Sequence, residues 1–223
     1  MYNLLIMRGM ETLDREIDER KETIELLESL DGYAKLSEKQ KQIIRTFLYL
    51  EDRSNREDAN VDYQKSLAHK DAWYCHAAVV SVELERVVDE LAIYPENIHR
   101  AIENETKFDS HFMKADYIDS DKTQQEVEDF IEEVGFPCTV VFSWFDGLEF
   151  DMLAHSCIAL GKDETGRLIV WEKKNAREAC RVINFGEVYD FYEQGLKDHN
   201  KAFPQKGYYG HWGVRKIETG GSL

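Results

Sequence analysis

The sequence has fewer basic than acidic residues and no long apolar run. Its 28 lysines and arginines face 44 aspartates and glutamates, which gives a formal net charge of −16. Such an acidic surface repels the phosphates of nucleic acids and of anionic lipids, so we expect no nucleic-acid partner and no membrane partner. No apolar stretch reaches the roughly 18 residues of a membrane-spanning helix.

Three further signals are missing. The first residues lack the basic start, long apolar region and small-residue cleavage site of a secretory signal, so we expect a cytoplasmic protein. The four cysteines form no CxxC pair, and in a cytoplasmic chain we expect them to be reduced. No glycine-rich phosphate loop is present, and we expect no cofactor.

The first third of the chain has the periodicity of helices. Leucine and isoleucine recur at spacings of three, four and seven from Leu13 to Leu30, with charged residues between them. Gly32 predicts the cap that ends this helix. Ser37 and Gln40 form the capping-box pattern that opens the next one. These features predict a helical hairpin.

A third helix is predicted from Asp71 to Leu91. Its first turns, "CHAAVVSV", are apolar nearly all round, and charged residues appear only in its later half. A helix that is apolar all round is buried, so we expect this one to lie at the centre of the fold. Cys75 lies in or close to its first turn.

The periodicity then changes to that of strands. Four short segments are rich in β-branched and aromatic residues and separated by turns: "CTVVFSWF", "LAHSCIALG", "RLIVWEK" and "CRVINF". Thr123 predicts the N-cap of a helix through Val134, and "GEVYDFYEQGLKDHN" predicts a closing helix. Helices followed by a meander predict an α+β fold with the central helix packed on an antiparallel sheet.

A cysteine at a helix N-terminus is a candidate nucleophile, because the partial positive charge there favours the thiolate. His76 is adjacent, so its ring points about 100° away on a helix and we expect it not to reach Cys75. His155 lies in an apolar strand, sharing one face with Cys157 and Ala159. It is either a half-buried histidine bonded to backbone or a general base facing the central helix.

These segments resemble the NlpC/P60 group of papain-like cysteine hydrolases over roughly residues 70–192. "DAWYCHAAVVSVELERVV" resembles the nucleophile helix, "FPCTVVFSW" the first strand, and "AHSCIALGKDETGRLIVWEK" the histidine strand, its turn and the third strand. The resemblance implies a papain-like fold with Cys75 as nucleophile and His155 as base. It places the orienting residue at the end of the third strand, where Glu172 is our assignment and Asn175 the alternative. Most relatives use histidine, asparagine or glutamine there, so a glutamate departs from the pattern.

The resemblance also divides the chain. We expect a helical N-terminal extension over residues 1–65, a papain-like domain over 66–200 and a C-terminal tail over 201–223, which is a final strand or a loose end. The extension either packs on the domain or serves as an arm for a protein partner or a homodimer. An insertion at 93–136 predicts a lid or specificity element.

The resemblance does not identify the substrate. Relatives that cut cell-wall peptides are usually exported, and we expect this chain to be cytoplasmic, so the cell-wall substrate does not carry over. A peptide-like or acyl substrate with an amide, isopeptide or ester bond remains open.

Two other functions compete with the hydrolase. His155 and Cys157 share a strand face, and Cys75 with His76 would add ligands for zinc, but the spacings match no usual zinc site and we expect no metal. The second alternative is a non-enzymatic interaction protein on the same fold, with its acidic helices as the working surface.

Overall fold

In the computed structural model, the described residues are 19–49, 75–86, 115–145, 151–173, 180–205 and 207–218. Residues 19–29 are helical. The elements that follow are α2 (Asp31–Lys35), α3 (Glu38–Tyr49), α5 (Cys75–Glu83), β1 (Asp116–Asp119), α7 (Gln124–Val134), β2 (Cys138–Phe145), β3 (Asp151–Lys162), β4 (Leu168–Glu172), β5 (Arg181–Asn184), α8 (Phe185–Ala202) and β6 (Tyr209–Lys216). Within these ranges, no helix has the length and apolar character needed to cross a membrane.

The strands form one six-stranded sheet in the order β1-β6-β2-β3-β4-β5, and every neighbouring pair is antiparallel. The predicted strands correspond to β2, β3, β4 and β5, which form the expected meander. Together with the helices, this sheet confirms the α+β class.

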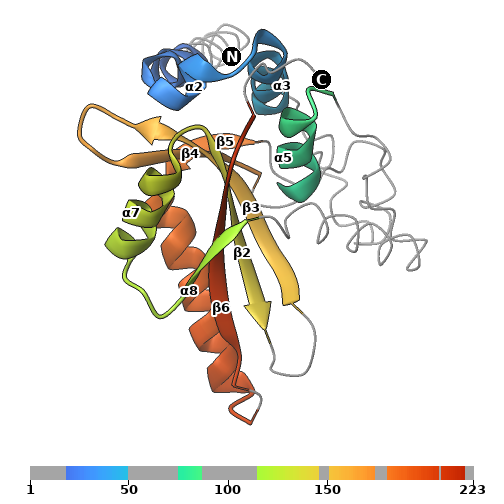
Figure 1. The fold of residues 1–223 in the computed structure, drawn as a ribbon, viewed down its shortest axis with the longest axis vertical. Helices are drawn as coiled ribbons and strands as arrows, with labels where there is room; N and C mark the ends of the chain where they lie inside the picture. Colours follow the sequence, from blue (N-terminus) through green and yellow to red (C-terminus); the bar gives the residue numbers. More distant parts are fainter. Residues whose placement is uncertain are drawn as a thin grey trace, which may run out of the picture.

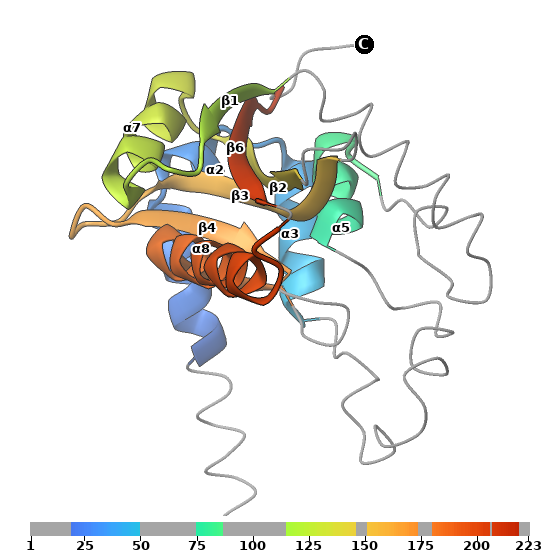
Figure 2. The same ribbon diagram turned by 90° about the horizontal axis from the view of Figure 1, so that it is seen from below.

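Helices cover both faces of the sheet (Figure 1), with α5 on one side and α7 and α8 on the other. The view from below shows the same arrangement (Figure 2). Ile158 and Leu160 of β3 pack into one core with α2, α3 and α5, whereas Cys157 and Ala159 pack into the other with α7 and α8. Successive strand residues point to opposite faces, so β3 is buried on both sides.

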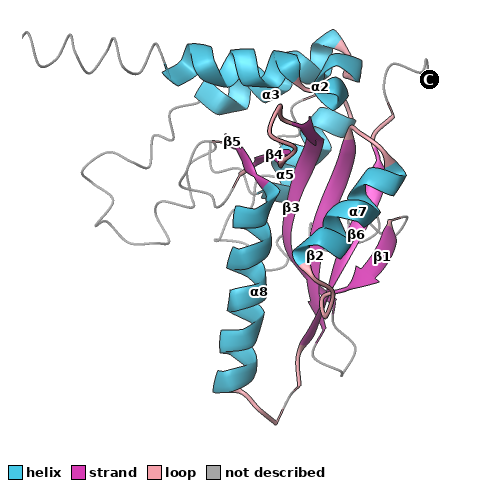
Figure 3. Ribbon diagram, turned by 90° about the vertical axis from the view of Figure 1, so that its left-hand side faces the viewer, coloured by secondary structure: helices cyan, strands magenta, loops and turns pink. Residues whose placement is uncertain are grey.

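The N-terminal helices belong to the first of these cores. Leu27 and Leu30 are almost completely buried, and Ile24 packs against them. Figure 3 shows α2 and α3 lying across one end of the sheet. The apolar stripe from residue 24 onward is therefore used by the domain itself. Leu13 and Ile17, which begin the predicted stripe, lie outside the described residues, so the partner arm stays a prediction.

The first helix ends close to the predicted position, but Gly32 is not its cap. Helical residues 19–29 are followed by α2, which begins at Asp31, so Gly32 lies inside a helix. A Cβ atom on Gly32 would lie 2.3 Å from the carbonyl oxygen of Leu160. The glycine is required there because α2 approaches the backbone of β3 too closely for a side chain.

Gly32→Ala is expected to lower the free energy of unfolding by about 2 kcal/mol, because α2 must move away from β3 to admit the methyl group. Urea denaturation of the purified variant measures this. The matched control is Gly195→Ala in α8, where an added Cβ meets no atom within 4 Å. This control should stabilise the protein by about 0.5–1 kcal/mol. A stabilising Gly32→Ala would contradict the close approach.

The central helix α5 is buried, as predicted. Ala78, Val79 and Val82 are each at most 1% exposed. The helix ends at Glu83, earlier than the predicted end at Leu91, which itself lies outside the described residues.

A Schellman motif explains this early end. The N–H of Arg86 donates to the carbonyl of Ser81, and the N–H of Glu85 donates to the carbonyl of Val82. Glu85 takes the required left-handed conformation, with φ 53°. Leu84, the residue after the last of α5, is 45% exposed.

The carboxylate of Glu83 fixes the C-terminal end of α5 to the sheet. It accepts hydrogen bonds from the hydroxyl of Thr139 on β2 and from the guanidinium of Arg215 on β6. Because α5 is a short rigid rod, this anchor also sets where its first residue, Cys75, lies relative to the strands.

The predicted capping box and the predicted N-cap at Thr123 are both present. Ser37 and Gln40 exchange side-chain and backbone hydrogen bonds ahead of α3. Thr123 and Glu126 do the same at the start of α7, and that helix ends at Gly135 with φ 84°.

Two segments differ from the predicted layout. The tail over 201–223 contains β6, which lies inside the sheet between β1 and β2, so the strand alternative is the one found. The predicted insertion over 93–136 contains β1 and α7 in its described part. These elements complete the sheet and cover one of its faces, so this part is integral to the fold and not a lid above it. Strand β1 was not predicted, because it has four residues with mostly exposed side chains and therefore no hydrophobic pattern.

Candidate functional site: a buried cysteine, two histidines and a glutamate

Cys75 and His155 come from opposite faces of the sheet. Cys75 is the first residue of α5, whereas the ring of His155 stacks on Tyr192 of α8 with centroids 4.7 Å apart. His155 shares a strand face with Cys157 and Ala159, as expected, and its ring also interacts with Cys75 at the start of the central helix. Strand alternation groups these residues on one face, but the helices that cover this face are α7 and α8.

The end of β4 explains how side chains from two faces can interact. The last residue pair between β3 and β4 is Cys157 with Glu172, so β3 continues past its neighbour. At His155, β3 pairs with Phe142 of β2 on its other side. A strand edge that is not covered by β4 is a place where side chains from both faces of the sheet come together.

The predicted contact between His155 and Glu172 is present. Nε2 of His155 lies 2.7 Å from Oε2 of Glu172, and the two side chains are 1% and 2% exposed. The other carboxylate oxygen accepts two hydrogen bonds from the guanidinium of Arg181, at 2.8 and 2.5 Å. Asn175, the alternative orienting residue, lies outside the described residues.

The charges at this site shift three groups. Burial alone would raise the pKa of the Cys75 thiol, but the imidazoles of His76 and His155 outweigh burial and hold this pKa well below its usual value. Burial alone would lower the pKa of His155, but Cys75 and Glu172 raise it to about 9. Burial likewise opposes ionisation of Glu172, whose pKa His155 and Arg181 nevertheless lower. This is the charge pattern of a thiolate, an imidazolium and a carboxylate.

The ring nitrogen of His155 that does not face Glu172 is Nδ1. It is buried and has no hydrogen-bond partner of ordinary geometry among the described residues. Cys75 therefore interacts electrostatically with this ring without a tight hydrogen bond to it. Catalytic hydrogen bonds are often poorly aligned in enzymes without substrate.

The other three cysteines have the opposite character. Burial raises the pKa of Cys138 and of Cys180 to about 12, and raises that of Cys157 well above its usual value. Cys138 and Cys157 are completely buried in β2 and β3. Cys75 alone among the four is favoured as a thiolate.

His76, which we expected not to reach the thiol, has its ring bonded to β3. His76 is the first of the two imidazoles that lower the pKa of Cys75. Its Nδ1 lies 2.9 Å from the hydroxyl of Ser156 on β3. Side chains of adjacent helix residues diverge at Cβ, but a long ring held by a third group can still lie beside its neighbour.

The sequence reasoning also missed Arg181 and Tyr192. Arg181 is the residue opposite Glu172 in the β4–β5 register, so a cation facing a glutamate across a predicted hairpin was an available signal. Tyr192 carried no such signal, because only the packing of α8 on the sheet brings it to His155.

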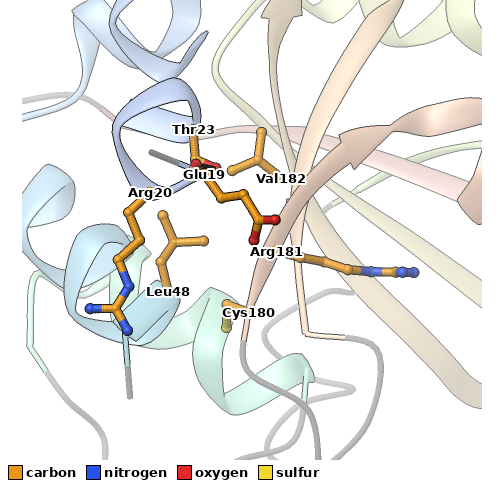
Figure 4. Close-up of a pocket in the computed structure, with 7 residues that line it drawn as sticks. All are labelled: Glu19, Arg20, Thr23, Leu48, Cys180, Arg181 and Val182. Carbon is orange, nitrogen blue, oxygen red and sulfur yellow. Dashed lines mark hydrogen bonds between the residues drawn. The ribbon is translucent and has the colours of Figure 1, made fainter. Parts of the chain in front are cut away.

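Two hollows adjoin this region. One, of about 120 Å³, lies on the α8 side and is lined by Glu172, Arg181, Glu187, Val188, Phe191 and Tyr192. The other, of about 260 Å³, lies between the N-terminal helix, α3 and β5 (Figure 4). Arg181 borders both, and Figure 4 shows its side chain extending away from the other residues that line the second hollow. The described residues contain no group of three side chains suited to hold a metal ion.

Comparison with known proteins gives no match: a scan of protein-family models, a search of curated proteins and a search of solved structures each found none. The chemistry of this site therefore rests on its own geometry.

Proposed function

We propose that the chain is a thiol hydrolase of the NlpC/P60-like, papain-like type that cleaves an amide, isopeptide or ester bond. Cys75 is the nucleophile, His155 the general acid and base, and Glu172 the residue that orients the imidazole. The order of cysteine helix, first strand, histidine strand and third strand supports this assignment. All four cysteines are free thiols.

One observation carries the proposal. Of four buried cysteines, only the one at the start of the central helix has a lowered thiol pKa, and it interacts with a histidine whose far nitrogen is bonded to a buried carboxylate. A structural cysteine gains nothing from such surroundings, whereas a nucleophile requires them.

The chemistry follows from these positions. The thiol proton moves to Nδ1 of His155, because Nε2 donates to Glu172. The sulfur of Cys75 then attacks the substrate carbonyl, and the negative charge passes to the carbonyl oxygen. The backbone N–H of Cys75 would stabilise that oxygen, a contribution on the order of 3 kcal/mol. The leaving group takes the proton from Nδ1 as its bond to carbon breaks. Water then gives a proton to Nδ1, attacks the thioester and releases the acid and the thiol.

Trapping with an electrophilic acyl probe tests the proposal. The acylating reagent p-nitrophenyl acetate is expected to form a thioester at Cys75 and to release a burst of p-nitrophenol. Mass spectrometry of the digested protein locates the acetyl group. Cys75→Ala should abolish the burst without unfolding the protein.

Cys157→Ala is the matched control, because it removes an equally buried thiol that has a raised pKa. It should leave the burst unchanged. Equal labelling of all four cysteines would contradict the hydrolase and leave the non-enzymatic interaction protein.

A further inference from the structure

The imidazole of His155 is contacted on a ring face as well as at a ring nitrogen. Glu172 of β4 lies 2.7 Å from its Nε2. Tyr192 of α8 stacks on the ring itself: the two ring planes are 18° from parallel, and their centroids are 4.7 Å apart. This separation is within the range of favourable aromatic pairs. The tyrosine therefore contacts the π-system of the imidazole and leaves both nitrogens to other groups.

Packing fixes the position of Tyr192. Its ring centroid lies 5.6 Å from that of Phe142 and 5.0 Å from that of Phe191, which meets it edge-on. Phe142 is also the residue paired with His155 between β2 and β3. Strand pairing fixes the backbone of His155 but not the rotation of its side chain. The stack on Tyr192, itself held by two phenylalanines, supplies that missing constraint.

We propose that Tyr192 is a positioning residue that orients the imidazole of His155 and stabilises its protonated form by a cation–π stack. This role rests on the proposed hydrolase function and deepens it. The imidazolium is present when the sulfur attacks the carbonyl, and it forms again when water gives its proton to Nδ1. A stack on the ring face stabilises the cation at both stages, because it does not use the nitrogen that carries the proton.

The physical basis is the charge distribution of the tyrosine ring. An aromatic face is negative and attracts a cation that lies within about 6 Å of its centroid, most strongly where water is excluded. His155 is 1% exposed, so water does not screen the contact. A neutral imidazole gains no such attraction. Burial alone would lower the pKa of His155, and the stack opposes that effect by favouring the charged form.

The titratable and charged groups near His155 among the described residues come from five elements: Cys75 of α5, Cys157 of β3, Glu172 of β4, Arg181 of β5 and Tyr192 of α8. Arg181 bonds the carboxylate of Glu172. Burial raises the pKa of the Cys157 thiol well above its usual value. Burial likewise raises the pKa of the Tyr192 hydroxyl, so this phenol stays neutral up to pH 10 and acts on His155 through its ring.

The decline of the acyl burst at high pH reports the protonation of His155 and tests the inference. Phenylalanine and its 4-fluoro, 3,5-difluoro and 3,4,5-trifluoro derivatives are introduced at position 192 of the full chain. Burst rates with p-nitrophenyl acetate are measured from pH 6 to 10, with the rate of Cys75→Ala subtracted. Each fluorine withdraws electrons from the ring face with little change of shape, so a cation–π contact weakens stepwise.

Tyr192→Phe should keep the parent midpoint, which lies at the His155 pKa of about 9. The trifluoro derivative should lower this midpoint by about one unit, which reduces the rate at pH 9 about fivefold. Tyr192→Leu, which removes the ring, should lower the midpoint at least as far. A ring that only fills space would give the same midpoint with and without fluorine.

The matched control is the same fluorinated series at Tyr189. This residue lies on the same helix, but its ring stacks on the indole of Trp212, which carries no charge, with planes 16° apart. The midpoint should stay at the parent value throughout that series. Circular dichroism melting checks that each variant folds.

A midpoint that stays constant across the fluorinated series at position 192 would overturn this inference, and a persistent acyl burst would leave the hydrolase proposal intact. A midpoint that rises in Tyr192→Leu would also overturn it, because the ring would then act only by excluding water. Equal shifts in the two series would contradict a specific stack on His155. If the parent protein gives no burst at Cys75, the hydrolase proposal fails, and the role of Tyr192 fails with it.

Discussion

Cys75 is expected to react with iodoacetamide at pH 6 more than roughly a hundredfold faster than Cys138 or Cys180. The thiolate is the reacting species, and its fraction falls tenfold for each unit by which pKa exceeds pH. Burial raises the pKa of both comparison cysteines to about 12, whereas two imidazoles hold that of Cys75 well below its usual value. Peptide mapping after timed alkylation measures all cysteines in one sample.

The same pair sets a pH window for acyl transfer. Below the lowered pKa of Cys75 the sulfur is protonated, and above about 9 the imidazole of His155 is neutral and has no proton for the leaving group. Acyl transfer should therefore be flat through neutral pH and decline as pH rises through about 9, as properties of the coupled pair. A rate that rises through pH 8 to 9, as for an ordinary thiol, would contradict an ion pair.

Glu172→Gln is expected to slow acyl transfer from p-nitrophenyl acetate by roughly two orders of magnitude or more. The carboxylate selects the imidazole tautomer that presents Nδ1 to Cys75, and its charge stabilises the imidazolium of His155. A glutamine keeps the shape and can accept one hydrogen bond, but it loses the charge that both His155 and Arg181 face. The decline of acyl transfer at high pH should also move below about 9, because the pKa of His155 loses one of the interactions that raise it.

Asn175→Ala is the comparison that separates the two assignments of the orienting residue. We expect it to leave both the rate and the pH profile unchanged. If Asn175→Ala abolishes acyl transfer while Glu172→Gln does not, the assignment of Glu172 is wrong. Arg181→Gln should have an intermediate effect. Arg181 forms an ion pair with the carboxylate of Glu172, but the arginine side chain is itself 37% exposed, so solvent weakens the interaction.

Features that depend only on residues close together in the sequence were predicted correctly. Hydrophobic periodicity identified β2 to β5, and the apolar surroundings of "CHAAVVSV" identified α5 as buried. Side-chain chemistry at fixed short spacing located the caps at Ser37 and Thr123. The pair of His155 and Glu172 was expected from the family resemblance and not from register, since the register partner of Glu172 is Cys157.

Other features depended on contacts between segments far apart in the sequence. Gly32 was predicted to cap a helix, but a glycine is needed there because the backbone of β3 at Leu160 leaves no room for a side chain. The early end of α5 follows a left-handed Glu85, and glutamate rarely takes that conformation without support from packing. No local pattern carries such information.

By itself the sequence determined the α+β class, the burial of the helix that contains Cys75 and the residues that share a face of each strand, because these follow from the fixed periods of helix and strand. Only the tertiary structure decided which helix covers which face of the sheet, that Tyr192 stacks on His155, and that the ring of His76 bonds Ser156. The physical reason is that periodicity defines the two faces of an element but not the partner of either face. That choice is made when both faces are buried together in the folded protein.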